Sequence, residues 1–157
     1  MAENIDIKVI IDENCTKPVV TIRTKEKDAQ VDQIINAIED AAQARFDNIP
    51  AYFNGKIELI PQNEIMRIRT EGRQIVLDTE TRYYIIKQTL SQLEEELSSR
   101  YFIRISQSEI INIFKVKEFD VSVSGTIGIE FENGVKTYAS RRYIKSIRQF
   151  LNNREGK

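Results

Sequence analysis

The pattern of apolar and polar residues along the chain changes near residue 48. Before that point, two short β-branched runs, IDIKVII and PVVTIRT, flank the turn-forming stretch DENCTKP, and together they predict a hairpin. Residues 28–46 then predict a helix capped by Asp28, because apolar residues recur there at helical spacing: Val31, Ile34, Ile35, Ile38, Ala42 and Phe46. A ββα segment of about 46 residues is small for an independent core, so we expect it to pack on the rest of the chain or on a second copy.

After the turn residues at 47–50, the pattern becomes one of many short strands. AYFNGKIELIP predicts a two-residue Asn-Gly hairpin, and EIMRIRTEGRQIVLDTETRYYII predicts three strands with turns at Glu71-Gly72 and at 79–81. Four more strand-like runs follow, and Asn133-Gly134 joins the last pair: YFIRI, FKVKEFDVSVS, TIGIEF and VKTYA.

Two helices are predicted among these strands. In TLSQLEEELSSR, the leucines share one helical face and Thr89 with Gln92 has the spacing of a capping box. SRRYIKSIRQFL, near the end of the chain, is amphipathic. We therefore expect an α+β, mostly β fold, with residues 1–48 as an N-terminal ββα segment and residues 49–157 as a β-rich domain.

The composition removes most enzyme and metal-site interpretations. The chain has no histidine, the usual general base near neutral pH and the commonest metal ligand, and its single cysteine, Cys15, has no thiol partner. We expect no catalytic residues, no metal and no cofactor. No apolar run approaches the roughly 20 residues of a bilayer span, and the N-terminus does not resemble a signal peptide, so we expect a cytoplasmic location.

Charge is distributed unevenly along the chain. Residues 1–64 hold 7 basic and 12 acidic residues, a balance of −5, whereas residues 65–157 hold 16 and 12, a balance of +4, and together these give the net charge of −1. Ten of the later basic residues are arginines. This asymmetry indicates an anionic partner for the second part of the chain.

The first candidate site is the polar stretch in FIRISQSEIIN. Ser106 and Glu109 have capping-box spacing, which predicts one short helical turn between two strands. A purely structural cap is one interpretation. The other uses what the cap leaves free, Gln107 and Ser108, which at the start of a helical turn suit phosphates or base edges.

The second candidate is Ser140-Arg141-Arg142, where Ser140 is expected to cap the last helix. Two cations in a first helical turn oppose the helix dipole, at a cost of a few tenths of a kcal/mol to about 1 each, unless an anion binds there. The guanidinium fork matches phosphate or the O6 and N7 edge of guanine. A solvated surface pair is the alternative.

The third candidate is the hairpin tip RTEGR, from which Arg69 or Arg73 could enter a groove of nucleic acid. A solvated tip is the ordinary alternative. The carboxylates Glu94, Glu95 and Glu96 suggest acid–base chemistry, but consecutive helical residues point in different directions, so they are interpreted as a solvated face.

In this order, the motifs resemble the LytTR family of bacterial DNA-binding domains. The pieces that carry the resemblance are IMRIRTEGRQIVLDT, TLSQLEEEL, YFIRISQSEIIN, FKVKEFD and ENGVKTYASRRYIKSI, and they cover about residues 55–152. The resemblance implies a transcription regulator with antiparallel β-sheets and short helices. In such a domain, loops enter successive major grooves of double-stranded DNA, and the DNA bends.

Carried over by position, the resemblance implies base contacts at Arg73, Ser106, Gln107 and Arg142. Many members have histidine in the middle loop, where this chain has Ser106 followed by Gln107. Glutamine pairs bidentately with adenine and arginine with guanine, each worth roughly 1–3 kcal/mol of discrimination. The residues expected to hold phosphates without reading sequence are Arg69, Ser108, Lys115, Lys117, Arg141 and Lys145.

The resemblance also bears on partners. A front of about 46 residues is too short for a phosphoacceptor receiver domain, and it is similar to that of stand-alone members, some of which are encoded beside a small membrane protein that restrains them. A membrane-protein antagonist is thus implied. We further expect helix 28–46 to mediate a homodimer, since two half-sites favour dimeric binding.

Two other functions stay open from the sequence. A protein–protein interaction module on the same β scaffold, without nucleic-acid binding, would suit the acidic front and the near-neutral total charge. RNA binding is a further option, but single-strand readers usually interleave exposed aromatic and basic residues. Here Tyr83, Tyr84, Tyr101 and Phe102 are expected at core and rim positions.

Overall fold

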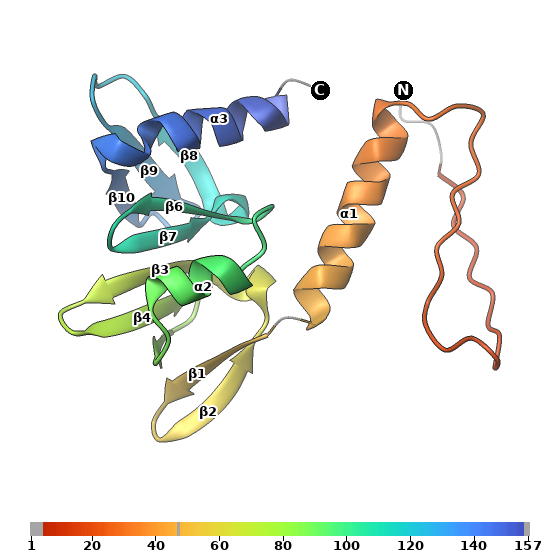
Figure 1. Cartoon of the computed structure of the whole chain (residues 1–157), viewed down its shortest axis with the longest axis horizontal. Helices are drawn as coiled ribbons and strands as arrows, with labels where there is room; N and C mark the ends of the chain where they lie inside the picture. The colour runs from red at the N-terminus through yellow and green to blue at the C-terminus, as the bar shows by residue number, and fades with distance from the viewer. Residues whose placement is uncertain (1–4, 47, 156–157) are drawn as a thin grey trace.

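The computed structural model describes residues 5–46 and 48–155, and it divides them into a long helix and a β-rich domain (Figure 1). The larger sheet has seven antiparallel strands in the order β2-β1-β5-β4-β3-β7-β6. Its strands are β1 (Ile49–Phe53), β2 (Lys56–Ile60), β3 (Ile65–Glu71), β4 (Gln74–Thr79), β5 (Tyr83–Ile86), β6 (Phe102–Ser106) and β7 (Glu109–Asn112). The expected mostly β, antiparallel architecture is confirmed.

A second sheet of three antiparallel strands, in the order β10-β9-β8, packs beside β6 and β7 (Figure 1). Its strands are β8 (Val116–Asp120), β9 (Ile127–Phe131) and β10 (Lys136–Ala139). The helices are α1 (Ala29–Phe46), α2 (Leu90–Glu96) and α3 (Ile144–Glu155), with short 3₁₀ turns η1 (Gln62–Glu64), η2 (Ile113–Lys115) and η3 (Arg141–Tyr143). None of the described helices is both long and apolar enough to cross a bilayer.

Local sequence chemistry explains why several elements begin and end where they do. Asn54 and Gly55 both have positive φ, 49° and 74°, as a two-residue turn between twisted strands requires. Thr89 accepts a hydrogen bond from the Gln92 backbone at 3.2 Å, and the Gln92 side chain accepts one from the Thr89 backbone at 3.0 Å. The predicted Asn-Gly hairpin and the capping box of α2 are both confirmed.

The apolar residues of the domain form two cores. The first lies under α2, where Leu90, Leu93 and Leu97 pack against strands β1 to β5. The second joins β6, β7, the three-stranded sheet and α3, and its fully buried members include Ile105, Phe131 and Ile147. The apolar face predicted for the last helix is therefore the face that packs into the second core.

The hairpin predicted for the front of the chain is wrong, because residues 5–28 form no strand. Only its turn is present, with the Cys15 backbone N–H donating to the Asp12 carbonyl at 3.0 Å. The side chains of Ile7 and Ile11 remain 82% and 91% exposed. An isolated two-stranded hairpin is marginal in water, and no third element covers these apolar residues in the described part of the chain.

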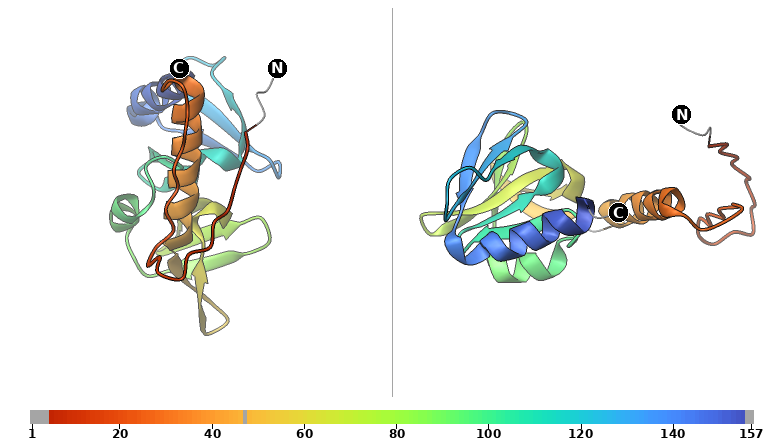
Figure 2. Two further views of the ribbon diagram at one scale, coloured as in Figure 1. Left: turned by 90° about the vertical axis from the view of Figure 1, so that its right-hand side faces the viewer. Right: turned by 90° about the horizontal axis from the view of Figure 1, so that it is seen from above.

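The helix predicted after this segment is confirmed as α1, capped by Asp28, whose carboxylate accepts the Val31 backbone N–H at 3.0 Å. It lies beside the β-rich domain and does not cover the front segment, which extends farther out (Figure 2). Arg100 ties α1 to the domain through ion pairs to Glu39 at 2.7 Å and to Asp40 at 3.0 Å. The expected packing on the rest of the chain is thus limited to one side of α1.

Candidate nucleic-acid interface

The polar stretch after β6 is a tight β-hairpin turn, so the helical turn predicted from Ser106 and Glu109 is wrong. Ser106 pairs across the ladder with Glu109, and only Gln107 and Ser108 lie between the strands. Glu109 caps nothing. Its buried carboxylate accepts from the Arg67 guanidinium at 3.1 Å and from the Thr137 hydroxyl at 2.7 Å.

The backbone of this turn is fixed by a residue that the sequence did not single out. Arg104 donates to the carbonyl of Ser106 at 3.0 Å and to the carbonyl of Gln107 at 2.7 Å, and it forms an ion pair with Glu94 of α2 at 3.0 Å. Ser106 Oγ also accepts the Ser108 backbone N–H at 3.1 Å. With these groups occupied, the side chain of Gln107 is exposed at the tip. The only sequence signal for this role is an arginine two residues before Ser106. Residue spacing does not show that its side chain folds back onto the turn carbonyls.

The β3–β4 hairpin ends beside the β6–β7 turn. Its turn residues are Gly72, with φ of 60°, and Arg73, whose side chain is exposed. The backbone N–H of Thr70 donates to the carbonyl of Ser108 at 2.8 Å, which holds the two tips together. Because β3 and β7 are adjacent, the two hairpin centres are two strand spacings apart, about 10 Å.

The third predicted point, Arg142, lies on the other side of β6. The backbone N–H of Ser140 donates to the carbonyl of Ile105 at 2.9 Å, which places the start of η3 against the end of β6. The tips carrying Arg73, Gln107 and Arg142 therefore form a row along one edge of the domain, at the left of Figure 1. The base contacts implied by the family resemblance require these three positions to lie close together.

The side-chain cap predicted for Ser140 is wrong. Its hydroxyl makes no capping bond, and the first turn is a 3₁₀ turn closed by the Tyr143 N–H on the Ser140 carbonyl at 2.9 Å. The tighter turn uses the backbone carbonyl and needs no hydroxyl. Arg141 and Arg142 remain exposed there, as expected.

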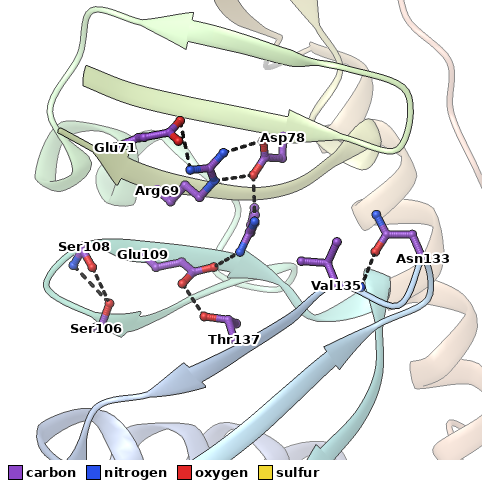
Figure 3. Close-up of polar contacts among 10 residues, drawn as sticks. Arg69, Glu71, Asp78, Ser106, Ser108, Glu109, Asn133, Val135 and Thr137 are labelled. Carbon is purple, nitrogen blue, oxygen red and sulfur yellow. Dashed lines mark hydrogen bonds and ion pairs between the residues drawn. The ribbon is translucent and has the colours of Figure 1, made fainter. Parts of the chain in front are cut away.

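A network of charged side chains lies behind the row and joins the two sheets (Figure 3). Asp78 accepts from Arg67 Nε at 2.8 Å and from Arg69 Nε at 2.7 Å. Arg67 continues to Glu109, and Glu109 to Thr137 of β10. The hairpin tips thus stand on strands that are bound to each other by charge-assisted hydrogen bonds.

Two of the predicted phosphate contacts, Arg69 and Lys115, already form ion pairs with carboxylates. Arg69 is held by Asp78 and by Glu71 at 3.2 Å, and the Asp78 hydrogen bond raises the pKa of Arg69 above its ordinary value. Lys115 pairs with Glu80 at 2.9 Å at the opposite end of the sheet from Arg73. A phosphate at Arg69 or Lys115 would have to compete with a carboxylate already bound.

The remaining predicted phosphate contacts differ in their position. Lys117 lies on β8, toward the end of the strand away from the row, and pairs with Glu130 at 3.6 Å. Ser108 is in the β6–β7 turn itself, while Arg141 and Lys145 follow the row into α3. The structure brings these last three, but not Lys115 or Lys117, to the edge that carries the tips.

Within the described ranges, no three His, Cys, Asp or Glu residues are grouped so that they could hold a metal ion. The functional chemistry of the edge is instead that of guanidinium, amide and hydroxyl groups on short loops. Exposed guanidinium and amide groups on adjoining β-loops have the chemistry that nucleic-acid-binding proteins use for phosphates and base edges.

Residues 55–152 match the LytTr DNA-binding domain family, and the chain belongs to that family. The solved LytTr DNA-binding domain of a Bacillus cereus protein, described as a methyl-accepting/DNA response regulator, has the same fold, with a TM-score of 0.64 and 20% identity. The similarity covers 67% of this chain and 96% of that one. The resemblance drawn from the motifs is confirmed.

Relatives with similar sequences occur in Staphylococcus aureus. Proteins of strains NCTC 8325 and MRSA252, both named uncharacterised HTH-type transcriptional regulators, are 28% and 27% identical to this chain over 145 residues. Each alignment covers 92% of this chain and 97% of the relative. The similarity therefore includes the front segment as well as the β-rich domain.

Proposed function

We propose that this protein is a sequence-specific DNA-binding transcriptional regulator that reads base edges in successive major grooves through Arg73, Gln107 and Arg142. The observation that carries the proposal is the row of adjoining tips, tied together by the bonds from Thr70 to Ser108 and from Ser140 to Ile105. The family match and the names of the S. aureus relatives support the regulatory role.

Loops are the reading elements because the helices are unsuited to the task. A helix-turn-helix needs two consecutive helices joined by a short turn, with the second in the major groove. In the described part of the chain, five strands separate α1 from α2, and five more separate α2 from α3. The elements of this fold that can enter a DNA groove are therefore the short loops between its strands.

The three tips offer two kinds of base contact. Arg73 and Arg142 form no ion pair within the described residues, so each guanidinium is available for the bidentate contact with guanine. Gln107 can pair with adenine in the same manner, and Ser106 lies beside it as a shorter donor or acceptor. Ser108, Arg141 and Lys145 would hold the flanking phosphates.

The dimensions of the row favour bent DNA. The two hairpin tips are about 10 Å apart, roughly three base-pair steps at 3.4 Å each. Equivalent points on successive turns of straight DNA are about 34–36 Å apart. Extended arginines at both ends of the row would reach two grooves more readily if the duplex curved toward the protein.

The test is binding of the full chain to duplexes selected from genomic fragments, measured by fluorescence anisotropy. Arg142→Ala should relax preference at one base pair, at a cost of about 1–3 kcal/mol for the preferred base. Arg82→Ala, which removes a half-exposed arginine at the opposite end of the sheet, is the matched control and should leave preference unchanged. Equal binding of wild-type protein to every duplex would refute the proposal.

We infer a second role, self-association, for residues 5–46, which include α1, the helix expected from the sequence to mediate a homodimer. Six large apolar residues there are at least 61% exposed, a concentration typical of interaction surfaces: Ile7, Val9, Ile10, Ile11, Val19 and Val20. The acidic balance of this part of the chain disfavours DNA, and a homodimer would match two half-sites. Sedimentation that gives a monomer both alone at high concentration and on DNA would exclude the homodimer. A membrane-protein antagonist stays a prediction from the family resemblance.

A further inference from the structure

A second basic surface continues the row beyond Arg142. The loop between β8 and β9 rises beside the start of α3 (Figure 1), and between them lies an open groove of about 930 Å³. Three cations line it, Arg141, Lys145 and Arg148. None of its nine lining residues is acidic, so its charge is positive throughout.

The three cations share one side of a continuous helical segment. Their positions, i, i+4 and i+7, place them in line over about 10 Å of helix. Neighbouring like charges at i and i+4 repel each other. No ion pair relieves this repulsion within the described residues, although Arg67, Arg104 and Lys117 of the same domain are all paired.

The opposite wall of the groove is shaped to lie close to Arg141. Gly125 has φ of +84°, a conformation that residues with a side chain rarely adopt. A Cβ at this position would stand 3.2 Å from Arg141 Nη2. Glycine at residue 125 thus allows this backbone conformation and leaves the guanidinium close to the loop with no side chain between them, and the neighbouring Ser124 adds a hydroxyl to the same wall.

We propose that this groove takes the sugar–phosphate backbone of one DNA strand, with Arg148 as a phosphate contact beyond those expected from the sequence. The proposal rests on the function proposed above and extends the same interface past Arg142. Phosphates of one strand follow one another every 3.4 Å along the duplex axis and lie farther apart along the strand itself, so a 10 Å line of cations spans at most about three of them.

The shape of the groove favours a polyanion over a small anionic ligand. It is open along its length, and the charges are spread in a line instead of converging on one point. Lys145 offers a point charge that suits a phosphate and carries no base information. The contact should therefore add affinity for all sequences alike.

The experiment measures binding of the full chain at several salt concentrations, with a selected duplex and a scrambled one. Arg148→Gln should reduce the magnitude of the slope of log K against log salt by about 0.9, and Lys145→Gln with Arg148→Gln by about 1.8. The loss should be equal on both duplexes. Lys136→Gln, which removes an exposed lysine from the far end of β10, is the control and should leave the slope unchanged.

A second readout uses duplex length. Trimming the selected duplex at the end nearest the base pair read by Arg142, so that it no longer reaches the groove, should lower wild-type affinity at least as much as Arg148→Gln does on the full duplex. The same trimming should cost Lys145→Gln with Arg148→Gln less than it costs the wild type. Gly125→Ala, which displaces Arg141, should weaken both duplexes equally while the unfolding transition remains cooperative.

The outcomes separate the two proposals. If Arg148→Gln keeps the wild-type slope while Arg142→Ala still relaxes base preference, the groove proposal is overturned and the proposed function stands. If Arg148→Gln abolishes binding of an acidic peptide but leaves both duplexes unaffected, the groove is a protein site and the proposal is again overturned. Wild-type protein that shows no preference for the selected duplex overturns the proposed function and the groove proposal with it.

Discussion

Replacing Asp78 by asparagine should lower the free energy of unfolding by about 2–4 kcal/mol. The Asp78 side chain is 12% exposed and accepts short hydrogen bonds from Arg67 and Arg69, while a third contact, to Arg69 Nη2 at 3.4 Å, is too long to contribute much. Each short bond to a charged group contributes about 1.5–3 kcal/mol, so their loss would cost up to about 6.

Two compensations reduce that figure. Asparagine keeps one acceptor oxygen, and each guanidinium keeps another carboxylate, Glu109 for Arg67 and Glu71 for Arg69. The resulting estimate of about 2–4 kcal/mol overlaps the roughly 3–5 measured when one partner of a buried ion pair is removed. With a urea dependence of about 2 kcal/mol per molar, the midpoint should fall by about 1–2 M.

The assay is urea unfolding followed by circular dichroism, with Glu80→Gln as the matched control. Glu80 also pairs with a cation, Lys115, but its carboxylate is on the surface, so its removal should not move the midpoint. An Asp78→Asn protein that unfolds at the wild-type urea concentration, with the same slope, would refute the idea that this network stabilises the fold.

Three further predictions follow from individual contacts. Arg104→Lys cannot hold both carbonyls of the β6–β7 turn, so it should weaken discrimination at the base pair assigned to Gln107 in anisotropy measurements, whereas Glu94→Gln should not. Thr89→Ala removes the cap of α2 and should cost about 1 kcal/mol in urea unfolding; no change would show that the cap is dispensable. Burial and a carboxylate hydrogen bond raise the pKa of Tyr84 above its ordinary 10.0, so the fold favours the neutral phenol. That contribution is complete below pH 10 and is lost as pH rises through the higher folded pKa, so wild-type protein should lose stability above pH 10 more steeply than Tyr84→Phe, and parallel pH profiles would contradict this.

The parts of the fold that the sequence predicted are those that local chemistry determines. Asn54-Gly55 requires positive φ at both positions, and the Thr89 cap involves residues three apart, so neither depends on distant neighbours. The front hairpin failed because its strands needed a covering element. The turn after Ser106 failed because capping-box spacing also suits a two-residue hairpin turn, and the choice depends on partners of Glu109 that are 28 and 42 residues away.

For the candidate site too, the sequence predicted what depends on local structure and missed what depends on tertiary contacts. Turn and helix-start positions identified Arg73, Gln107 and Arg142 as exposed, because such positions project from their elements. Spacing could not show that Arg69 and Lys115 are held by carboxylates, since Asp78 and Glu80 reach them only in the folded sheet. Those pairings are tertiary contacts, which the spacing of residues within one sequence does not reveal.

The most direct test of the central claim is a binding selection from randomised duplexes, carried out with wild-type protein and with Arg73→Ala, Gln107→Ala and Arg142→Ala. Since the tips adjoin in that order along one edge, each variant should relax preference at a different base pair, and the three positions should follow the same order along the DNA. Three variants that relax one shared position, or that leave every preference intact, would contradict the account.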